Sequence, residues 1–281
     1  MMDAKQKSLA VVEVSLVALI FVTLLTIGIY RIFPSFETWQ TETIGFAFPV
    51  FVDVVMVGLS VLMILLRRKK LVDYGLRFTP LKYHIDIAAT CFIPVVLAGF
   101  PLGMGVNYQS WDGALVMAAV QVGLLFLLAL ILRRKPSLPG AGMAAAGMIM
   151  FFPSATGAPP AGKIIAIFLT YALFVGFGEE ILYRGYVQSR LNEVFGKPWR
   201  FFGVPFGWGA VIASLIFGLS HAGILGHLLG LSIKITLAWS FWTFFGGLVF
   251  SFVREKTGSI LAPALLHGLP QAIATVAMLF I

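Results

Sequence analysis

Long apolar runs separated by short polar segments dominate the chain. A transmembrane helix needs about 20 mostly apolar residues to cross about 30 Å of hydrocarbon. Eight runs approach that length, at residues 9–30, 43–66, 85–105, 112–132, 163–182, 205–225, 228–253 and 258–280. The pattern therefore predicts an all-α polytopic membrane protein with about eight transmembrane helices.

A further apolar run, GAGMAAAGMIMFF at 141–153, is too short for an ordinary span. Prolines at 136, 139 and 153 flank it and restrict any helix there. A ninth short crossing, a re-entrant segment and an interfacial helix all remain open. Because no long polar linker interrupts the chain, we expect residues 1–281 to form one membrane domain.

Composition supports a membrane location. Hydrophobic residues make up 59% of the chain and charged residues only 11%, which is outside the range of soluble globular proteins. The single cysteine, Cys91, excludes an intrachain disulfide and is expected to serve packing. Lys5 and Lys7 precede the first apolar run, but no small-residue cleavage site follows it, so we interpret that run as a retained span.

Lysine and arginine concentrate in alternate loops. The loops after the second and fourth runs are strongly basic, whereas FPSFETWQTET and NYQSWDG contain neither residue. The positive-inside rule then predicts a cytoplasmic N-terminus. This bias and attraction to anionic headgroups account for the net charge of +8, so we expect the bilayer as a partner and no nucleic acid.

Ionisable residues inside apolar runs are costly, by about 2.5–3.5 kcal/mol at a helix centre. Asp53 lies well inside the second run, and we favour a structural partner for it over a cation. Lys234 lies near the start of its run and can snorkel to the interface. His84 and His227 lie at segment edges, where we expect interfacial positions.

The stretch GFGEEILYRG at 177–186 places three ionisable groups together. If residues 163–195 form one helix, Glu180 and Arg184 share a face and can pair. Glu179 then points about 100° away, which would leave it free to face a cavity. The alternative is that both glutamates lie at the cytoplasmic interface and pair with Arg184 and Arg190.

Two histidines on other apolar runs favour a site. His221 ends the sixth run and His267 lies within the last, with Gln271 four residues later on the same helical face. A lone histidine in a membrane usually only bonds a neighbouring helix. Carboxylates with two histidines from three helices, however, could activate water and polarise a carbonyl group.

These residues form three ordered motifs: two glutamates followed after three residues by Arg184, Phe217 followed after three by His221, and His267 followed after three by Gln271. In this order they resemble the CAAX prenyl endopeptidase and bacteriocin-processing (CPBP, Abi) family of intramembrane glutamate proteases. The resemblance covers residues 163–272, the expected catalytic core, and the N-terminal 160 residues only as generic spans.

The resemblance implies an intramembrane endopeptidase and a role for each motif residue. Glu179 with His221 would activate the attacking water, and His267 with Gln271 would stabilise the oxyanion. Glu180 and Arg184 would hold the first motif in shape, with Phe217 as support from the second. No cofactor is implied; zinc is a minority alternative, because no HExxH pair fixes ligand spacing on one helix.

The implied substrate is a membrane-associated peptide or lipid-modified protein, for which a prenylated CAAX C-terminus is one candidate. The implied location is a plasma membrane, expected to be prokaryotic. Gln271 departs from the family pattern, which has asparagine there; it keeps the amide donor on an arm one methylene longer. We therefore keep a catalytically weak or silent scaffold or immunity factor of the same family as an alternative, and an ion-coupled transporter as a lesser one.

Overall fold

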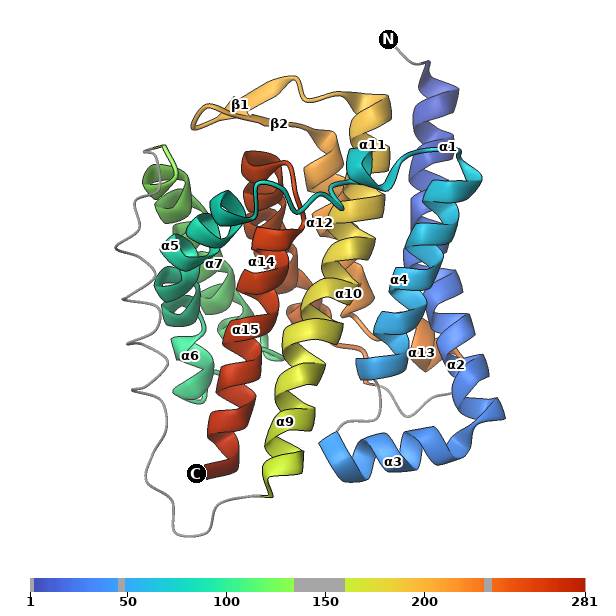
Figure 1. The fold of residues 1–281 in the computed structure, drawn as a ribbon, viewed down its shortest axis with the longest axis vertical. Helices are drawn as coiled ribbons and strands as arrows, with labels where there is room; N and C mark the ends of the chain where they lie inside the picture. The colour runs from blue at the N-terminus through green and yellow to red at the C-terminus, as the bar shows by residue number, and fades with distance from the viewer. Residues whose placement is uncertain (1–2, 45–48, 134–159, 230–233, 281) are drawn as a thin grey trace.

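The computed structural model describes residues 3–44, 49–133, 160–229 and 234–280, and most of these residues lie in helices that stand side by side in one bundle (Figure 1). Six of the described helices are long and apolar enough to cross a bilayer. Two shorter apolar helices, Val50–Leu66 and Trp208–Ser220, accompany them. The predicted class, an all-α polytopic membrane protein, is confirmed.

The first half of the bundle consists of α1 (Ala4–Ser15), α2 (Val22–Ile32), α3 (Pro34–Ile44), α4 (Pro49–Leu66), α5 (Leu81–Ala98), α6 (Phe100–Gly103) and α7 (Trp111–Ile131). A π-helical segment, Leu16–Phe21, joins α1 and α2 into one 29-residue span. The predicted run 43–66 begins too early, since α3 is a separate helix lying across one end of the bundle (Figure 1). Pro49 opens α4, where its fixed φ suits a first helical turn.

The second half consists of α9 (Ala161–Leu169), α10 (Gly176–Glu180), α11 (Gln188–Phe195), α12 (Trp208–Ser220), α13 (Ile224–Leu228), α14 (Leu237–Thr257) and α15 (Leu261–Ala277). Strands β1 (Trp199–Phe201) and β2 (Val204–Phe206) form an antiparallel hairpin before α12. The predicted runs 205–225 and 228–253 therefore also begin too early. Run 205–225 begins inside the apolar strand β2, which hydropathy did not separate from α12, and run 228–253 begins at the end of α13, well before α14. The segment 141–153 lies outside the described residues.

One long helix, Ala161–Phe195, carries the first motif. It contains α9, α10 and α11, joined by the π-helical segments Thr170–Val175 and Ile181–Val187. Such wide turns are rare and frequently accompany functional sites. The helix therefore continues past Glu179 and Glu180, as the pairing of Glu180 with Arg184 required.

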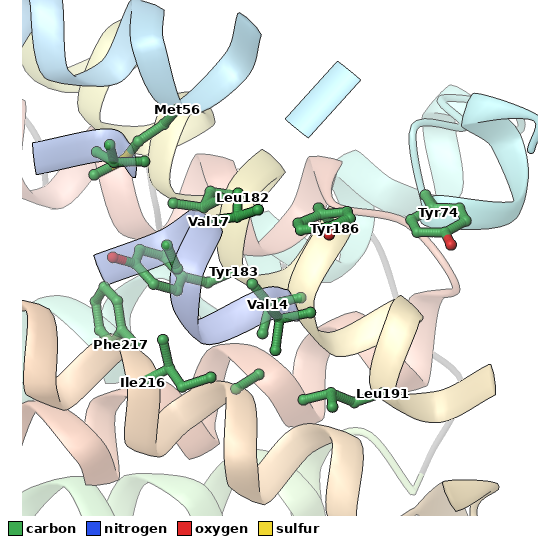
Figure 2. Close-up of a cluster of buried hydrophobic side chains, with 14 of the residues drawn as sticks. Val14, Val17, Met56, Tyr74, Leu182, Tyr183, Tyr186, Leu191, Ile216 and Phe217 are labelled. Atoms are coloured by element: carbon green, nitrogen blue, oxygen red, sulfur yellow. The ribbon is translucent and has the colours of Figure 1, made fainter. Parts of the chain in front are cut away.

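A buried apolar cluster fixes this helix against its neighbours (Figure 2). Val14 and Val17 of the N-terminal span pack with Leu182 and Tyr183, and the Tyr183 ring meets Phe217 of α12 edge to face at 5.0 Å between centroids. The cluster joins the first half of the chain to the motif helix.

The isolated residues outside the motifs differ in how far they are buried. Cys91 is buried and Lys234 is exposed, as expected. His227 is exposed on α13. His84 lies at a segment edge, three residues after α5 begins, and its side chain is buried with its ring against Tyr83; its interfacial position stays a prediction.

A polar network holds the end of the bundle where α1 begins. We call this end the basic face; it carries Arg67, Lys69, Arg190 and Lys197. Glu13 of α1 accepts hydrogen bonds from Arg67, Arg190 and Tyr186. Glu193 accepts one from Tyr74, and burial, followed by this carboxylate, raises the pKa of Tyr74 to about 12. The predicted cytoplasmic location of the basic face stays a prediction.

Candidate active site

Glu180 and Arg184 form a fully buried ion pair in the motif helix. Arg184 Nη1 donates to Glu180 Oε1 over 2.8 Å, and both side chains have 0% exposure. A buried charge needs its partner, because leaving one uncompensated costs about 3–5 kcal/mol. The i, i+4 spacing predicted this contact, and it places Glu180 in a different environment from Glu179.

Helix α14 and two aromatic rings complete the surroundings of Arg184. Its Nη2 donates to the carbonyl oxygen of Gly247 over 3.2 Å. The guanidinium lies 4.4 Å from the Phe217 ring centroid and 5.4 Å from that of Phe250. Cation–π contact with desolvated rings is favourable, so Phe217 supports the first motif directly.

His267 of α15 lies between the two glutamates. Its Nδ1 is 3.0 Å from Glu180 Oε1, and its Nε2 is 3.6 Å from Glu179 Oε2. Since the Glu180 carboxylate accepts this hydrogen bond, Nδ1 carries the hydrogen. Phe250 stacks on the imidazole at 4.8 Å with an interplanar angle of 16° and so fixes the plane of the ring.

Two glycines bring α15 close enough for this contact. A Cβ added at Gly268 would lie 2.7 Å from the carbonyl oxygens of Ala172 and Tyr171, and one at Gly176 would lie 2.8 Å from the carbonyl oxygen of Ala264. Small residues permit such close crossings between membrane helices. Gly268 directly follows His267, so the crossing places the imidazole beside the glutamates.

Glu179 is the less constrained of the two glutamates. Its side chain is 16% exposed, and its Oε2 accepts no hydrogen bond from the described residues. The nearest cationic candidate is His267, beyond hydrogen-bond distance at 3.6 Å. Of the two carboxylates, Glu179 is therefore the one with fewer polar contacts and greater exposure.

His221 ends α12 on the other side of Phe217. Its Nδ1 is 2.8 Å from the Phe217 carbonyl oxygen, which can only accept, so Nδ1 donates and leaves Nε2 as acceptor in the neutral ring. The Phe217 ring meets both imidazoles edge to face, at 4.7 Å for His221 and 6.1 Å for His267. Phe217 thus separates the histidines of the second and third motifs.

The structure places Gln271 one turn beyond His267, as its spacing predicted, with its side chain exposed. It brings together Glu179, Glu180, Arg184, Phe217 and His267, with His221 against Phe217. Sequence reasoning missed Phe250 and the Gly247 carbonyl, since neither lies in a motif. The described residues contain no group of three His, Cys, Asp or Glu side chains arranged to hold a metal ion.

The bundle and this cluster together define a class, the polytopic membrane proteins with a buried glutamate–arginine–histidine site. Residues 161–273 match the family model described as Type II CAAX prenyl endopeptidase Rce1-like. The match covers the part of the chain that carries the three motifs and supports their resemblance to CAAX prenyl endopeptidases. Comparison with curated proteins and with solved structures found no match.

Proposed function

We propose that the protein is an intramembrane endopeptidase that hydrolyses a peptide bond of a membrane-associated substrate, with Glu179 as general base. The observation that carries the proposal is the inequality of the two adjacent glutamates. Oε1 of Glu180 accepts from Arg184 and His267, whereas Glu179 is 16% exposed and accepts no hydrogen bond within the described part of the chain; the Oε2 atoms of both glutamates have no donor among the described residues. A base must be free to accept a proton, and a carboxylate already neutralised by arginine is a poor one.

In the proposed reaction, Glu179 transfers the proton and His221 orients the attacking water. Glu179 takes a proton from water while the water oxygen attacks the carbonyl carbon of the substrate. His221, with its Nε2 as acceptor, orients that water. The proton then passes to the leaving nitrogen as the C–N bond breaks, so the site ends in its starting protonation state.

His267 stabilises the oxyanion in this scheme. Glu180 orients the imidazole through Nδ1, so the Nε2–H of the imidazolium is directed toward the region of Glu179. Loss of one oxyanion donor typically costs about 2.7–4 kcal/mol of transition-state stabilisation. Gln271 supplies a second donor through its amide.

A substrate with a lipid-modified C-terminus of the CAAX type suits the family match and a site between apolar helices. The test compares wild type, Glu179→Ala and His221→Ala in detergent, with a fluorogenic farnesylated CAAX peptide and an unprenylated membrane peptide. Wild type should cleave, and each variant should lose at least about 100-fold in rate, the usual contribution of general base catalysis.

Matched controls come from exposed residues of the same types, Glu37→Ala on α3 and His227→Ala on α13, which should cleave as wild type does. Cleavage surviving both site substitutions would remove the assignment. If no sample cleaves either peptide but wild type carries ions into liposomes, the transporter alternative replaces the protease.

Gln271→Asn restores the family residue and should be at least as active as wild type. If wild type is inactive and Gln271→Asn cleaves, the native protein is a silent family member. A collapse of activity in this variant would mean that the site depends on the longer glutamine arm.

A further inference from the structure

Asp53 is a buried acid directly beside the first motif, although it lies more than a hundred residues earlier in the chain. It occupies α4, is only 3% exposed, and its Oδ2 has no hydrogen-bond partner among the described residues. No ion pair of the described part of the chain includes it. An unpaired buried carboxylate is too costly to persist without compensation.

A glycine in the motif helix makes room for this acid. A Cβ added at Gly178 would lie 2.6 Å from Asp53 Cβ and 2.8 Å from Asp53 Oδ1. The carboxyl group therefore rests on the backbone immediately before Glu179. Because Gly178 directly precedes Glu179, this packing places Asp53 next to the glutamate in the fold.

The titratable neighbours of the two acids are few. The motif helix presents Glu179, Glu180, Tyr183 and Arg184, and α15 presents His267. From α2, Tyr30 interacts with Asp53 and is also hydrogen-bonded to Gln40. On the segment Thr170–Val175, which also packs on α4, the titratable group is Tyr171, buried in a cluster with Val50. Arg184 is already committed to Glu180 and Gly247.

Charge balance then locates a proton. Asp53, Glu179 and Glu180 supply three carboxyl groups, and the groups beside them that can carry positive charge are Arg184 and His267. His221 lies on the other side of Phe217, where its Nδ1 bonds the Phe217 carbonyl oxygen and the ring is neutral in the proposed scheme. Neutrality in an apolar surrounding requires one carboxyl group to be protonated. Glu180 accepts from both cations, so the proton belongs to Asp53 or Glu179.

We infer that Asp53 is a positioning residue that shares one proton with Glu179, so that the two acids titrate as a coupled pair. The inference rests on the proposed function only for its catalytic consequence. Two close acids that share a proton release their protons in two separate steps. The first step lies at a lower pH, and the second at a higher pH, than the single step expected for either acid alone. With one proton held by the pair, Asp53 donates a hydrogen bond to the Glu179 carboxylate and orients it for the attacking water.

Infrared titration of the carboxyl C=O bands tests the pair without requiring activity. The protein in lipid nanodiscs is titrated as wild type, Asp53→Asn, Glu179→Gln and the control Ser60→Ala; Ser60 is also buried on α4 but bonds only within its own helix. Wild type and the control should show two separated steps, and each acid variant a single step between them. A remaining acid that titrates unchanged when the other is replaced overturns the inference. Glu179→Gln provides this result even if Asp53→Asn fails to fold.

Peptide cleavage against pH provides the catalytic readout. Because the first step of a coupled pair lies below that of an isolated acid, Asp53→Asn should move the acidic limb of kcat/KM to higher pH by at least about half a unit. If Asp53→Asn folds with lower stability but keeps the acidic limb of kcat/KM at the wild-type pH, Asp53 serves packing alone and the inference is overturned. Two infrared steps in a wild type that cleaves nothing would keep the acid pair and reject the protease instead.

Discussion

Two groups of paired charges in the bundle are enclosed to different degrees. At the basic face, Glu13 and Glu193 share several donors and remain 20–25% exposed. In the motif site, Glu180 and Arg184 are fully enclosed, yet Oε2 of Glu180 and Nε of Arg184 lack hydrogen-bond partners among the described residues.

The difference is one of access to solvent. The network of the basic face joins α1, the end of α4 and α11, and its carboxylates stay partly exposed. Both groups leave a buried polar atom without a hydrogen-bond partner among the described residues, Nε of Arg67 at the basic face and Oε2 of Glu180 in the motif site, but only the motif site encloses its charged pair completely.

The largest effect on this comparison is expected from Arg184→Met. It leaves Glu180 buried without its cation, and the free energy of unfolding should fall by about 3–5 kcal/mol. Thermal unfolding in detergent measures the change. Lys82→Met is the matched control, because Lys82 and Asp86 also form an i, i+4 pair but Lys82 is mostly exposed. That variant should lose about 0.3–0.5 kcal/mol, and similar losses in both would contradict the account.

A smaller effect is expected from Gly268→Ala, which pushes α15 away from the motif helix. The added methyl group meets two backbone carbonyl oxygens, so overpacking should cost about 1–3 kcal/mol. Cleavage should fall together with stability, because His267 moves with the helix. Gly28→Ala is the control, since its Cβ would meet nothing within 4 Å. Equal behaviour of the two variants would show that the close crossing does not position the site.

The smallest effect is expected at the basic face, from Glu13→Gln. This change keeps the shape of the side chain and weakens partly exposed pairs with Arg67 and Arg190, so stability should fall by about 1 kcal/mol or less. Cleavage per folded molecule should not change. A selective loss of activity without unfolding would extend the functional site to the basic face.

Helical periodicity predicted part of this site and could not predict the rest. The i, i+4 rule gave the Glu180 pair with Arg184 and the separate direction of Glu179, since both follow from one helix. The position of His267 between the glutamates depends on the close crossing at Gly176 and Gly268, which is a tertiary contact. The proximity of Asp53 to Glu179 likewise depends on Gly178 and on packing between distant parts of the chain.

The fold shows the same division. Apolar run length predicted the helical class and most of the long helices. It placed the start of three spans too early, at the end of α3, inside β2 and at the end of α13, because hydropathy does not show where a short preceding element ends and the span begins. The start of α4 at Pro49 is marked in the sequence only by that proline and not by a change in the apolar pattern.

The most direct test of the central claim, that the adjacent glutamates have different tasks, is a paired measurement of cleavage and unfolding on Glu179→Gln and Glu180→Gln. We predict that Glu179→Gln lowers kcat by at least about 100-fold and changes the free energy of unfolding by less than about 1 kcal/mol. Glu180→Gln should instead destabilise the protein by several kcal/mol, because Arg184 loses its charge partner. If Glu179→Gln stays active, or if both variants lose stability and activity in the same proportion, the division of tasks is contradicted.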